Sequence, residues 1–227
     1  MNNSVAAQRL EALRQLMQQH QLDYYYIPST DAHNNEYVPA CWQRRGWISQ
    51  FTGSAGDVLI GLNEACLWTD PRYFLQAEQQ LDGEYFSLMK VTQGAAASNM
   101  LAWLLEHAPA KRVGVDPQTV SATTAGQWAP ALADMGGELV ALSDNLVDAV
   151  WQDQPELQHR PIHLHPEEYA GETAANKLQR LRQALAAKNL EAHVLSAMDA
   201  ICWLFNIRGQ DIDYNPLVIS YAVVTQE

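Results

Sequence analysis

The sequence predicts an α/β fold in which one supersecondary design occurs twice, the second time incompletely. The runs Trp47–Gly53 and Trp203–Gly209 share one order: Trp, an aliphatic residue, two variable residues, a large apolar residue, a polar residue and Gly. Each run follows a leucine-rich helical pattern and a short apolar stretch, and each precedes a β-branched run. Such internal similarity indicates two copies of one unit. Since the second copy stops early, we expect a fragment whose working chemistry lies beyond Glu227.

The elements of the first copy follow from local patterns. Ser4 suits a helix N-cap, and the apolar residues after it keep helical spacing as far as Met17. Asp70 followed by Pro71 predicts another helix start, because Asp caps well and Pro at the first helical position gives up only an unpaired N–H. The remaining patterns predict strands at 22–27, 58–60, 65–68, 85–91, 112–115 and 138–142, and helices at 41–51, 99–107 and 123–135.

The second copy repeats the beginning of this order after a proline-rich stretch. Mixed strands and helices of this kind predict helices packed on a mixed sheet. We therefore expect a complete domain at 1–154, a linker at 155–166 and an incomplete copy at 167–227. Its expected elements are a helix at 177–190, a strand at 192–195, the Trp-bearing segment at 200–205 and a strand at 217–224.

Bulk composition excludes several functional classes. Apolar residues make up 48% of the 227 residues and charged residues 18%, which favours globular domains over disorder. The 14 basic and 26 acidic side chains give a net charge of −12, which disfavours nucleic acid and anionic membranes as partners. The three cysteines are far apart and lie in apolar surroundings, so we expect buried reduced thiols. The chain shows no signal-peptide or membrane-span pattern, so we expect a cytoplasmic protein.

Several stretches, in the same order along nearly the whole chain, resemble the N-terminal region of the three-domain Xaa-Pro aminopeptidases (aminopeptidase P). These stretches are Ile27–Tyr37, Arg44-Arg45, Phe51–Gly56, Trp68–Ala77, Val113–Pro117, Asn145–Asp148 and Trp203–Gly209. The resemblance implies a creatinase-like N-terminal domain followed by a truncated second copy of the same fold. One departure is Pro71, where the family is expected to carry a small residue.

The resemblance also implies an activity that the chain by itself lacks. A complete member of the family has a C-terminal "pita-bread" metallopeptidase domain with a dinuclear site, usually of manganese, and removes the N-terminal residue from peptides with proline second. That domain is absent from this sequence. The resemblance implies that the present segment shapes the substrate cleft, contacts its own catalytic domain and takes part in a homodimer. The segment alone should be inactive. The alternative is a free-standing module of the same fold that binds peptides or proteins without hydrolysis.

Arg72 is the main candidate for substrate binding. A guanidinium in the first turn of a helix opposes the helix dipole, which suggests a role other than stabilising the helix. In the family the arginine of this motif contacts substrate, so the resemblance implies that Arg72 binds peptide carbonyl or carboxylate groups with its planar donors. The structural alternative is an ion pair with Asp70 or Glu36.

Other candidates are weaker. His33, with Asp31 and Glu36, could line a cleft or bind a metal, although such polar loops are more often solvated turns. His163 and His165 could form a metal pair on one face of a strand, but no third ligand is evident.

Two further motifs favour structural roles. Gly53–Gly56 lacks the lysine and spacing of a phosphate loop, so we expect a turn before a strand. Trp47 and Trp203 are expected to be core anchors of the two copies. No pair of carboxylates can be assigned as general acid and base.

Overall fold

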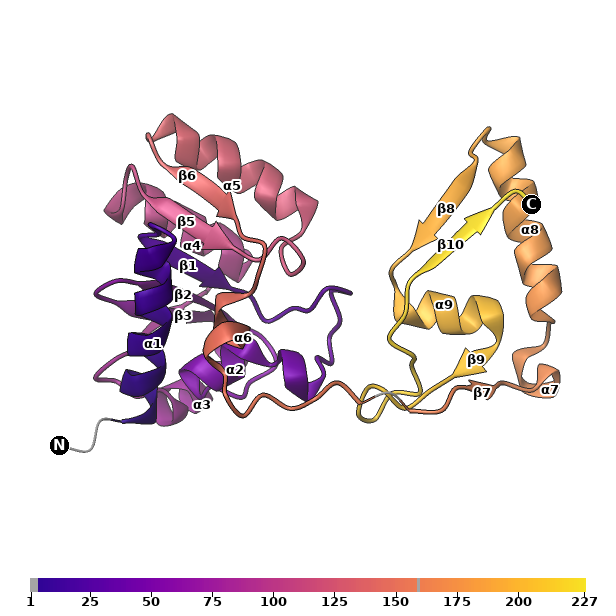
Figure 1. The fold of residues 1–227 in the computed structure, drawn as a ribbon, viewed down its shortest axis with the longest axis horizontal. Coiled ribbons are helices and arrows are strands. Elements are labelled where there is room, and N and C mark those ends of the chain that lie inside the picture. The colour runs from indigo at the N-terminus through magenta and orange to yellow at the C-terminus, as the bar shows by residue number, and fades with distance from the viewer. Residues whose placement is uncertain (1–3, 159) are drawn as a thin grey trace. The chain divides into compact units, whose positions relative to one another are not determined.

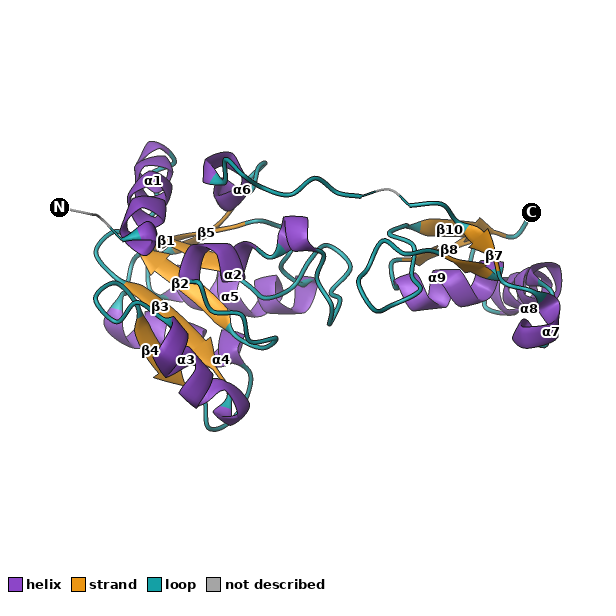
Figure 2. Cartoon of the chain, turned by 90° about the horizontal axis from the view of Figure 1, so that it is seen from below, coloured by secondary structure: helices purple, strands orange, loops and turns teal. Residues whose placement is uncertain are grey.

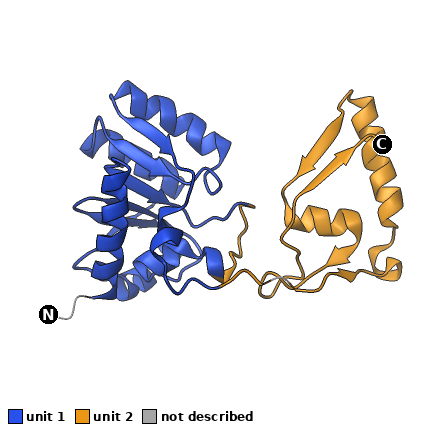
Figure 3. Ribbon diagram, viewed as in Figure 1, with its two compact units in different colours: residues 1–32, 41–155 blue, residues 33–40, 156–227 orange. Residues whose placement is uncertain are grey.

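The computed structural model describes residues 4–158 and 160–227, which divide into two compact units (Figure 3). Unit 1 comprises Met1–Ala32 and Cys41–Pro155, and unit 2 comprises His33–Ala40 and Glu156–Glu227. The loop 33–40 of the first copy is thus grouped with the second. The limits 1–154, 155–166 and 167–227 stay predictions, and the predicted linker includes residue 159, which lies outside the described residues.

Unit 1 is built on a mixed six-stranded sheet of order β4-β3-β2-β1-β5-β6 (Figure 1). Strand β2 pairs antiparallel with β1 on one side and with β3 on the other. The outer strands pair in parallel: β4 with β3, β5 with β1, and β6 with β5. The strands are β1 (Tyr24–Ile27), β2 (Asp57–Gly61), β3 (Ala65–Thr69), β4 (Ser87–Lys90), β5 (Arg112–Val115) and β6 (Glu138–Ala141).

Helices cover both faces of this sheet, which Figure 2 shows from a second direction. They are α1 (Val5–Gln19), α2 (Arg44–Ser49), α3 (Phe74–Gln80), α4 (Ala96–His107), α5 (Ala122–Asp134) and α6 (Leu146–Val150), with short 3-10 turns at Ala40–Trp42 and Pro71–Tyr73. Because strand side chains alternate, Tyr25 and Ile60 enter a core with α1, α2 and α6, while Tyr26 and Leu59 enter a second core with α4 and α5. The predicted α/β fold with a mixed sheet flanked by helices is confirmed.

The described residues of unit 2 form fewer elements, arranged as two separate strand pairs and three helices. Strands β8 and β10 pair antiparallel, and β7 pairs with β9. The buried core includes Leu185, Ile201, Leu204 and Val224. The elements are β7 (His163–Leu164), α7 (Glu167–Ala170), α8 (Ala174–Ala187), β8 (Ala192–Leu195), α9 (Met198–Phe205), β9 (Ile207–Arg208) and β10 (Ala222–Thr225).

The predicted duplication is visible in the backbone of each unit. Helices α1 and α8 are capped alike: the hydroxyls of Ser4 and Thr173 each accept a hydrogen bond from the backbone N–H three residues on. The pairing of β1 with β2 joins Tyr24 to Gly61 and Ile27 to Val58, and that of β8 with β10 joins Ala192 to Thr225 and Leu195 to Ala222.

Left-handed backbone positions recur as well. Gln50 ends α2 with φ of 63°, and Asn206 ends α9 with φ of 51°. After α1 and α8, Gln21 and Asn189 take φ of 56° and 54°. Since non-glycine residues seldom adopt this region, four matched positions indicate one chain path used twice.

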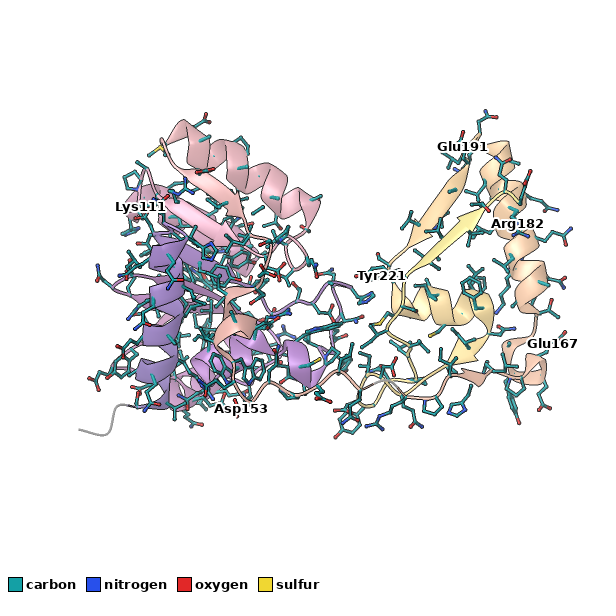
Figure 4. The ribbon with its side chains drawn as sticks, in the orientation of Figure 1. Lys111, Asp153, Glu167, Arg182, Glu191 and Tyr221 are labelled. Atoms are coloured by element: carbon teal, nitrogen blue, oxygen red, sulfur yellow. The ribbon has the colours of Figure 1, made fainter. Side chains whose placement is uncertain are left out.

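Two basic side chains tie α1 to the rest of unit 1, and two matched ones tie α8 to the rest of unit 2. The guanidinium of Arg9 in α1 lies 4.3 Å from the centre of the Trp47 ring and donates to the Trp47 carbonyl. Lys177 in α8 repeats this: its Nζ lies 4.4 Å from the Trp203 ring centre and 2.9 Å from the Trp203 carbonyl oxygen. One turn further, Arg14 and Arg182 donate through Nε to the end of β2 and of β10, at 2.9 and 3.2 Å. Figure 4 labels Arg182 on α8.

The environment of the second tryptophan corrects one prediction. Trp47 packs against the core of unit 1 and stacks on Trp151, with ring centres 5.3 Å apart. Trp203 is 51% exposed, so its assignment as a core anchor is wrong. The reason is that unit 2, as described, contains no helix corresponding to α6, the element that precedes Trp151.

Element ends differ from the predictions in a few places. The strand expected at 217–224 is confined to β10, because the backbone N–H and C=O groups of Leu217 bond to Asn215 and Asp211 in a turn. Helix α6 and the short α7 were not predicted. The cysteines are buried and unpaired, as expected. No helix in the described ranges has the length and apolar character needed to cross a membrane.

Candidate substrate-binding surface around Arg72

Arg72 lies on a short 3-10 turn, Pro71–Tyr73, that connects β3 to α3. Asp70 is the N-cap: its Oδ1 accepts from the backbone N–H of Arg72 at 3.0 Å. Pro71 fills the position where no N–H is required, as predicted. The sequence Trp-Thr-Asp-Pro-Arg thus ends a buried strand and presents the arginine side chain at the surface.

The Arg72 guanidinium folds back onto the same carboxylate. Its Nε and Nη2 lie 2.9 and 2.7 Å from the two Asp70 oxygens. This bidentate pair holds the pKa of the Asp70 carboxyl below its usual range, chiefly through the hydrogen bond from Arg72. The ion pair named as the structural alternative is therefore present. It orients the guanidinium while the side chain stays 70% exposed, so the pair contributes little to stability.

Tyr73, the residue after Arg72, is held in place by contacts with Phe51 and Ser54. Its ring stands edge-on to Phe51, with ring centres 6.0 Å apart, and its hydroxyl lies 2.7 Å from the Ser54 hydroxyl. The Arg72 guanidinium lies 5.3 Å from the centre of the same ring. The Gly53–Gly56 stretch, predicted as a turn before a strand, bends the chain into β2 as expected, and it supports the residues beside Arg72.

The buried side chain of Arg45 stabilises this turn by hydrogen bonds to its backbone carbonyls. It is buried, donates from Nη1 to the Phe51 carbonyl at 3.0 Å and from Nη2 to the Gly53 carbonyl, and its guanidinium lies 4.9 Å from the Phe51 ring centre. Burial lowers the pKa of this guanidinium to about 10. Sequence reasoning missed Arg45. The available signal was its position three residues before Ile48, which places Arg45 on the buried face of α2.

His33 is placed in unit 2, away from solvent. Its Nδ1 lies 2.9 Å from the Ser196 carbonyl oxygen, so this nitrogen carries the proton, and its ring stacks on Tyr221 with centres 4.3 Å apart. Figure 4 labels Tyr221 just before β10. Since His33 is 8% exposed and Asp31 is also buried, the expectation of a solvated loop is wrong for these two residues.

Metal-ligating residues do not gather in the described part of the chain. No group of three or more His, Cys, Asp or Glu side chains there could hold a metal ion. His163 lies in β7, whereas His165 follows the strand and its ring tilts toward Tyr169 at 6.1 Å between centres. The described residues therefore do not fit a dinuclear metal site, and no step of metal chemistry is assigned to them.

Comparison with known proteins places these features in a family. The family described as Creatinase/Prolidase N-terminal domain matches residues 9–150, and a second model of the same description matches residues 153–227. A probable Xaa-Pro aminopeptidase P from Penicillium rubens is 45% identical over 221 residues, which cover 96% of this chain and 36% of that protein. One from Aspergillus flavus is 41% identical over 96% of this chain. The chain spans about a third of the length of these curated relatives.

Solved structures agree with this placement. An X-prolyl aminopeptidase from Caenorhabditis elegans, described as a cytosolic enzyme with a di-nuclear active site, matches with a TM-score of 0.92 and 35% identity. The match covers 99% of this chain and 38% of that one. The N-terminal domain of PepQ from Mycobacterium tuberculosis shares the fold, with a TM-score of 0.50 over 63% of this chain. With the first family match alone spanning more than half of its length, this chain belongs to the creatinase/prolidase N-terminal domain family.

Proposed function

We propose that this chain is the N-terminal part of a metal-dependent Xaa-Pro aminopeptidase and that it binds and positions peptides without cleaving them. The observation that supports the proposal is the match of nearly the whole chain to about a third of a probable Xaa-Pro aminopeptidase P, together with its match to a family described as an N-terminal domain. Hydrolysis would belong to a C-terminal domain, where two divalent metals, manganese in our expectation, would activate water.

Arg72 is the residue proposed to contact substrate. Its planar fork of N–H donors matches a peptide carbonyl or a C-terminal carboxylate, which are the polar groups of a peptide with proline in second position. Asp70 holds the guanidinium by two bonds, which reduces the entropy lost when substrate binds. His33 enters the proposal indirectly: it fastens the loop 33–40 through Ser196 and Tyr221.

The proposal also includes the compartment and the oligomeric state of the enzyme. We place it in the cytoplasm, as a homodimer, with this segment shaping the substrate cleft and contributing to contacts between subunits. The cytosolic description of the Caenorhabditis elegans relative supports the compartment.

A first experiment tests the division of labour. The 227-residue chain is incubated with manganese and a peptide of sequence Xaa-Pro-Yaa, and release of the N-terminal residue is followed. We expect no turnover. Robust hydrolysis by this chain would overturn the assignment of chemistry to another domain.

A second experiment tests Arg72 in the longer enzyme that carries this segment. Arg72→Ala should lower kcat/KM for Xaa-Pro peptides by about tenfold to a hundredfold, the loss expected for one or two charge-assisted hydrogen bonds. Arg112→Ala is the matched control, because Arg112 is also a partly exposed arginine paired with a carboxylate, that of Glu138. If the Arg72 variant and the control have equal kcat/KM, Arg72 does not contact substrate. A reading frame without a metal-ligating domain would instead favour the binding-module alternative.

A further inference from the structure

Loop 52–55, which lies between α2 and β2, is held by side chains along its whole length. Each of its four residues is bonded to a side chain from outside the loop: Thr52 to Gln80, Gly53 to Arg45, Ser54 to Tyr73 and Ala55 to Thr69. Surface loops are usually the more mobile parts of a fold, yet Thr52 and Ser54 are exposed and bonded all the same. These bonds fix the position of the loop relative to the end of β3 and to α3.

Two of the four bonds hold the ends of the segment 70–72, which carries the candidate arginine. Thr69 comes immediately before this segment and Tyr73 immediately after it. The Thr69 hydroxyl donates to the Ala55 carbonyl at 2.6 Å, and the Tyr73 hydroxyl lies 2.7 Å from that of Ser54. Adjacent residues of the loop therefore brace the segment on both sides.

The Tyr73 ring is fixed together with its hydroxyl, and it restrains the arginine. A Cβ built on Gly53 would lie 2.6 Å from Cδ1 of Tyr73, so the ring lies directly on the loop backbone. The Arg72 guanidinium lies 5.3 Å from the centre of this ring, while Asp70 binds its Nε and Nη2. An exposed arginine otherwise has many rotamers, and a ligand that selects one of them binds at a cost in entropy.

We propose that Tyr73 is a positioning residue for Arg72 and that its bond to Ser54 sets the direction in which the guanidinium meets a peptide. The inference rests on the proposed function, because it assumes that Arg72 contacts substrate. Neutral hydrogen bonds at an exposed site add little to stability, since water replaces either partner. Loss of the Tyr73 hydroxyl should therefore change the arginine more than the fold.

The first measurement needs no catalysis and uses the 227-residue chain. Hydrogen exchange of the Arg72 Nε–H, which is bonded to a carboxylate at 2.9 Å, is followed by NMR. Tyr73→Phe keeps the ring and removes the hydroxyl, and it should speed this exchange by about threefold, as loss of one hydrogen bond would. Ser54→Ala should do the same, whereas Ser54→Thr, which keeps a hydroxyl, should retain the slow exchange. The Arg112 Nε–H, bonded to the Gln21 carbonyl at 3.0 Å, is the internal control and should not change.

Kinetics of the longer enzyme that carries this segment test whether the orientation serves substrate. Tyr73→Phe should lower kcat/KM for Xaa-Pro peptides by about threefold to tenfold. In the Arg72→Ala background the same change should have no further effect, because a residue that acts only through Arg72 then has nothing to position. Tyr24→Phe is the matched control. It also removes a tyrosine hydroxyl bonded to a side chain, that of Glu64, but at the opposite end of the strands, so kcat/KM should be unchanged.

The outcomes separate this inference from the proposed function. If Arg72→Ala leaves kcat/KM unchanged, the proposed function fails and the positioning role falls with it. If Arg72→Ala lowers kcat/KM but Tyr73→Phe acts no more strongly than Tyr24→Phe, the proposed function stands and the positioning role is overturned. An equal loss from Tyr73→Phe with and without Arg72 overturns it too, because that loss would be structural. Unchanged exchange of the Arg72 Nε–H in both Tyr73→Phe and Ser54→Ala has the same consequence.

Discussion

Replacing Gly53 by Ala tests how the turn beside Arg72 is packed. A Cβ built on Gly53 would lie 2.3 Å from Cζ of Phe51 and 2.6 Å from Cδ1 of Tyr73. Neither ring can yield easily, because Phe51 is completely buried and Tyr73 is held by Ser54. The glycine that closes the repeated tryptophan motif is therefore required by close packing, since its backbone is not in the left-handed region.

The expected cost follows from the size of the overlap. Ordinary contacts of a Cβ begin near 3.4 Å, so one ring must move by more than 1 Å. Inserting a methyl group into a filled core costs about 1–3 kcal/mol, and the full burial of Phe51 places this site at about 3 kcal/mol. For a unit of this size the loss lowers Tm by about 10 °C.

Urea unfolding and differential scanning calorimetry measure this loss in the transition of unit 1. Gly126→Ala is the matched control, because Gly126 lies inside α5 and its Cβ would meet nothing within 4 Å. That variant should gain about 0.5–1 kcal/mol from helix propensity. The packing argument is refuted if Gly53→Ala is as stable as the wild-type protein, or if the two variants lose stability equally.

Three further predictions concern buried or partly buried polar groups. Lys177→Met should reduce the free energy of unfolding of unit 2 by about 2 kcal/mol in urea titrations, through loss of bonds to the end of α9, whereas Lys177→Arg, which copies Arg9, should retain most of it. A double-mutant cycle on Arg44 and Asp148, with Ala at each position, should give a coupling of about 1–3 kcal/mol; additive losses would contradict the pairing. Burial raises the pKa of the Cys66 thiol from 9.0 to about 12. The unfolded thiol then ionises first, so unfolding free energy should fall as pH rises above 9, and less steeply in Cys66→Ala.

The sequence predicted the fold well where a local pattern and burial agree. The spacing from Leu10 to Met17 gave the buried face of α1, and Asp70 with Pro71 gave the helix start that presents Arg72. The repeated tryptophan motif revealed the duplication, because a supersecondary unit keeps its order of apolar residues when it is copied. These features depend on neighbours within a few residues along the chain.

Features that depend on distant contacts were missed. Nothing near His33 in sequence indicates that its ring stacks on Tyr221, since the partner is far along the chain. Helix α6 is too short for periodicity to reveal, and Trp203 could not be separated from Trp47 because their local sequences match. Whether a side chain is buried depends on the elements that pack over it, and a local sequence motif does not specify those elements.

The two copies also show which interactions the chain path requires. Core residues change between the copies, as when Tyr25 becomes His193, and the two strand pairs still keep the same register. What persists are the groups that satisfy backbone atoms at element ends: the Ser4 and Thr173 caps, and the cation that reaches the carbonyl of each tryptophan. Unpaired backbone carbonyls and N–H groups are costly wherever they are buried, whereas apolar side chains can substitute for one another. Backbone satisfaction at these few positions therefore constrains this fold more tightly than the identity of its core.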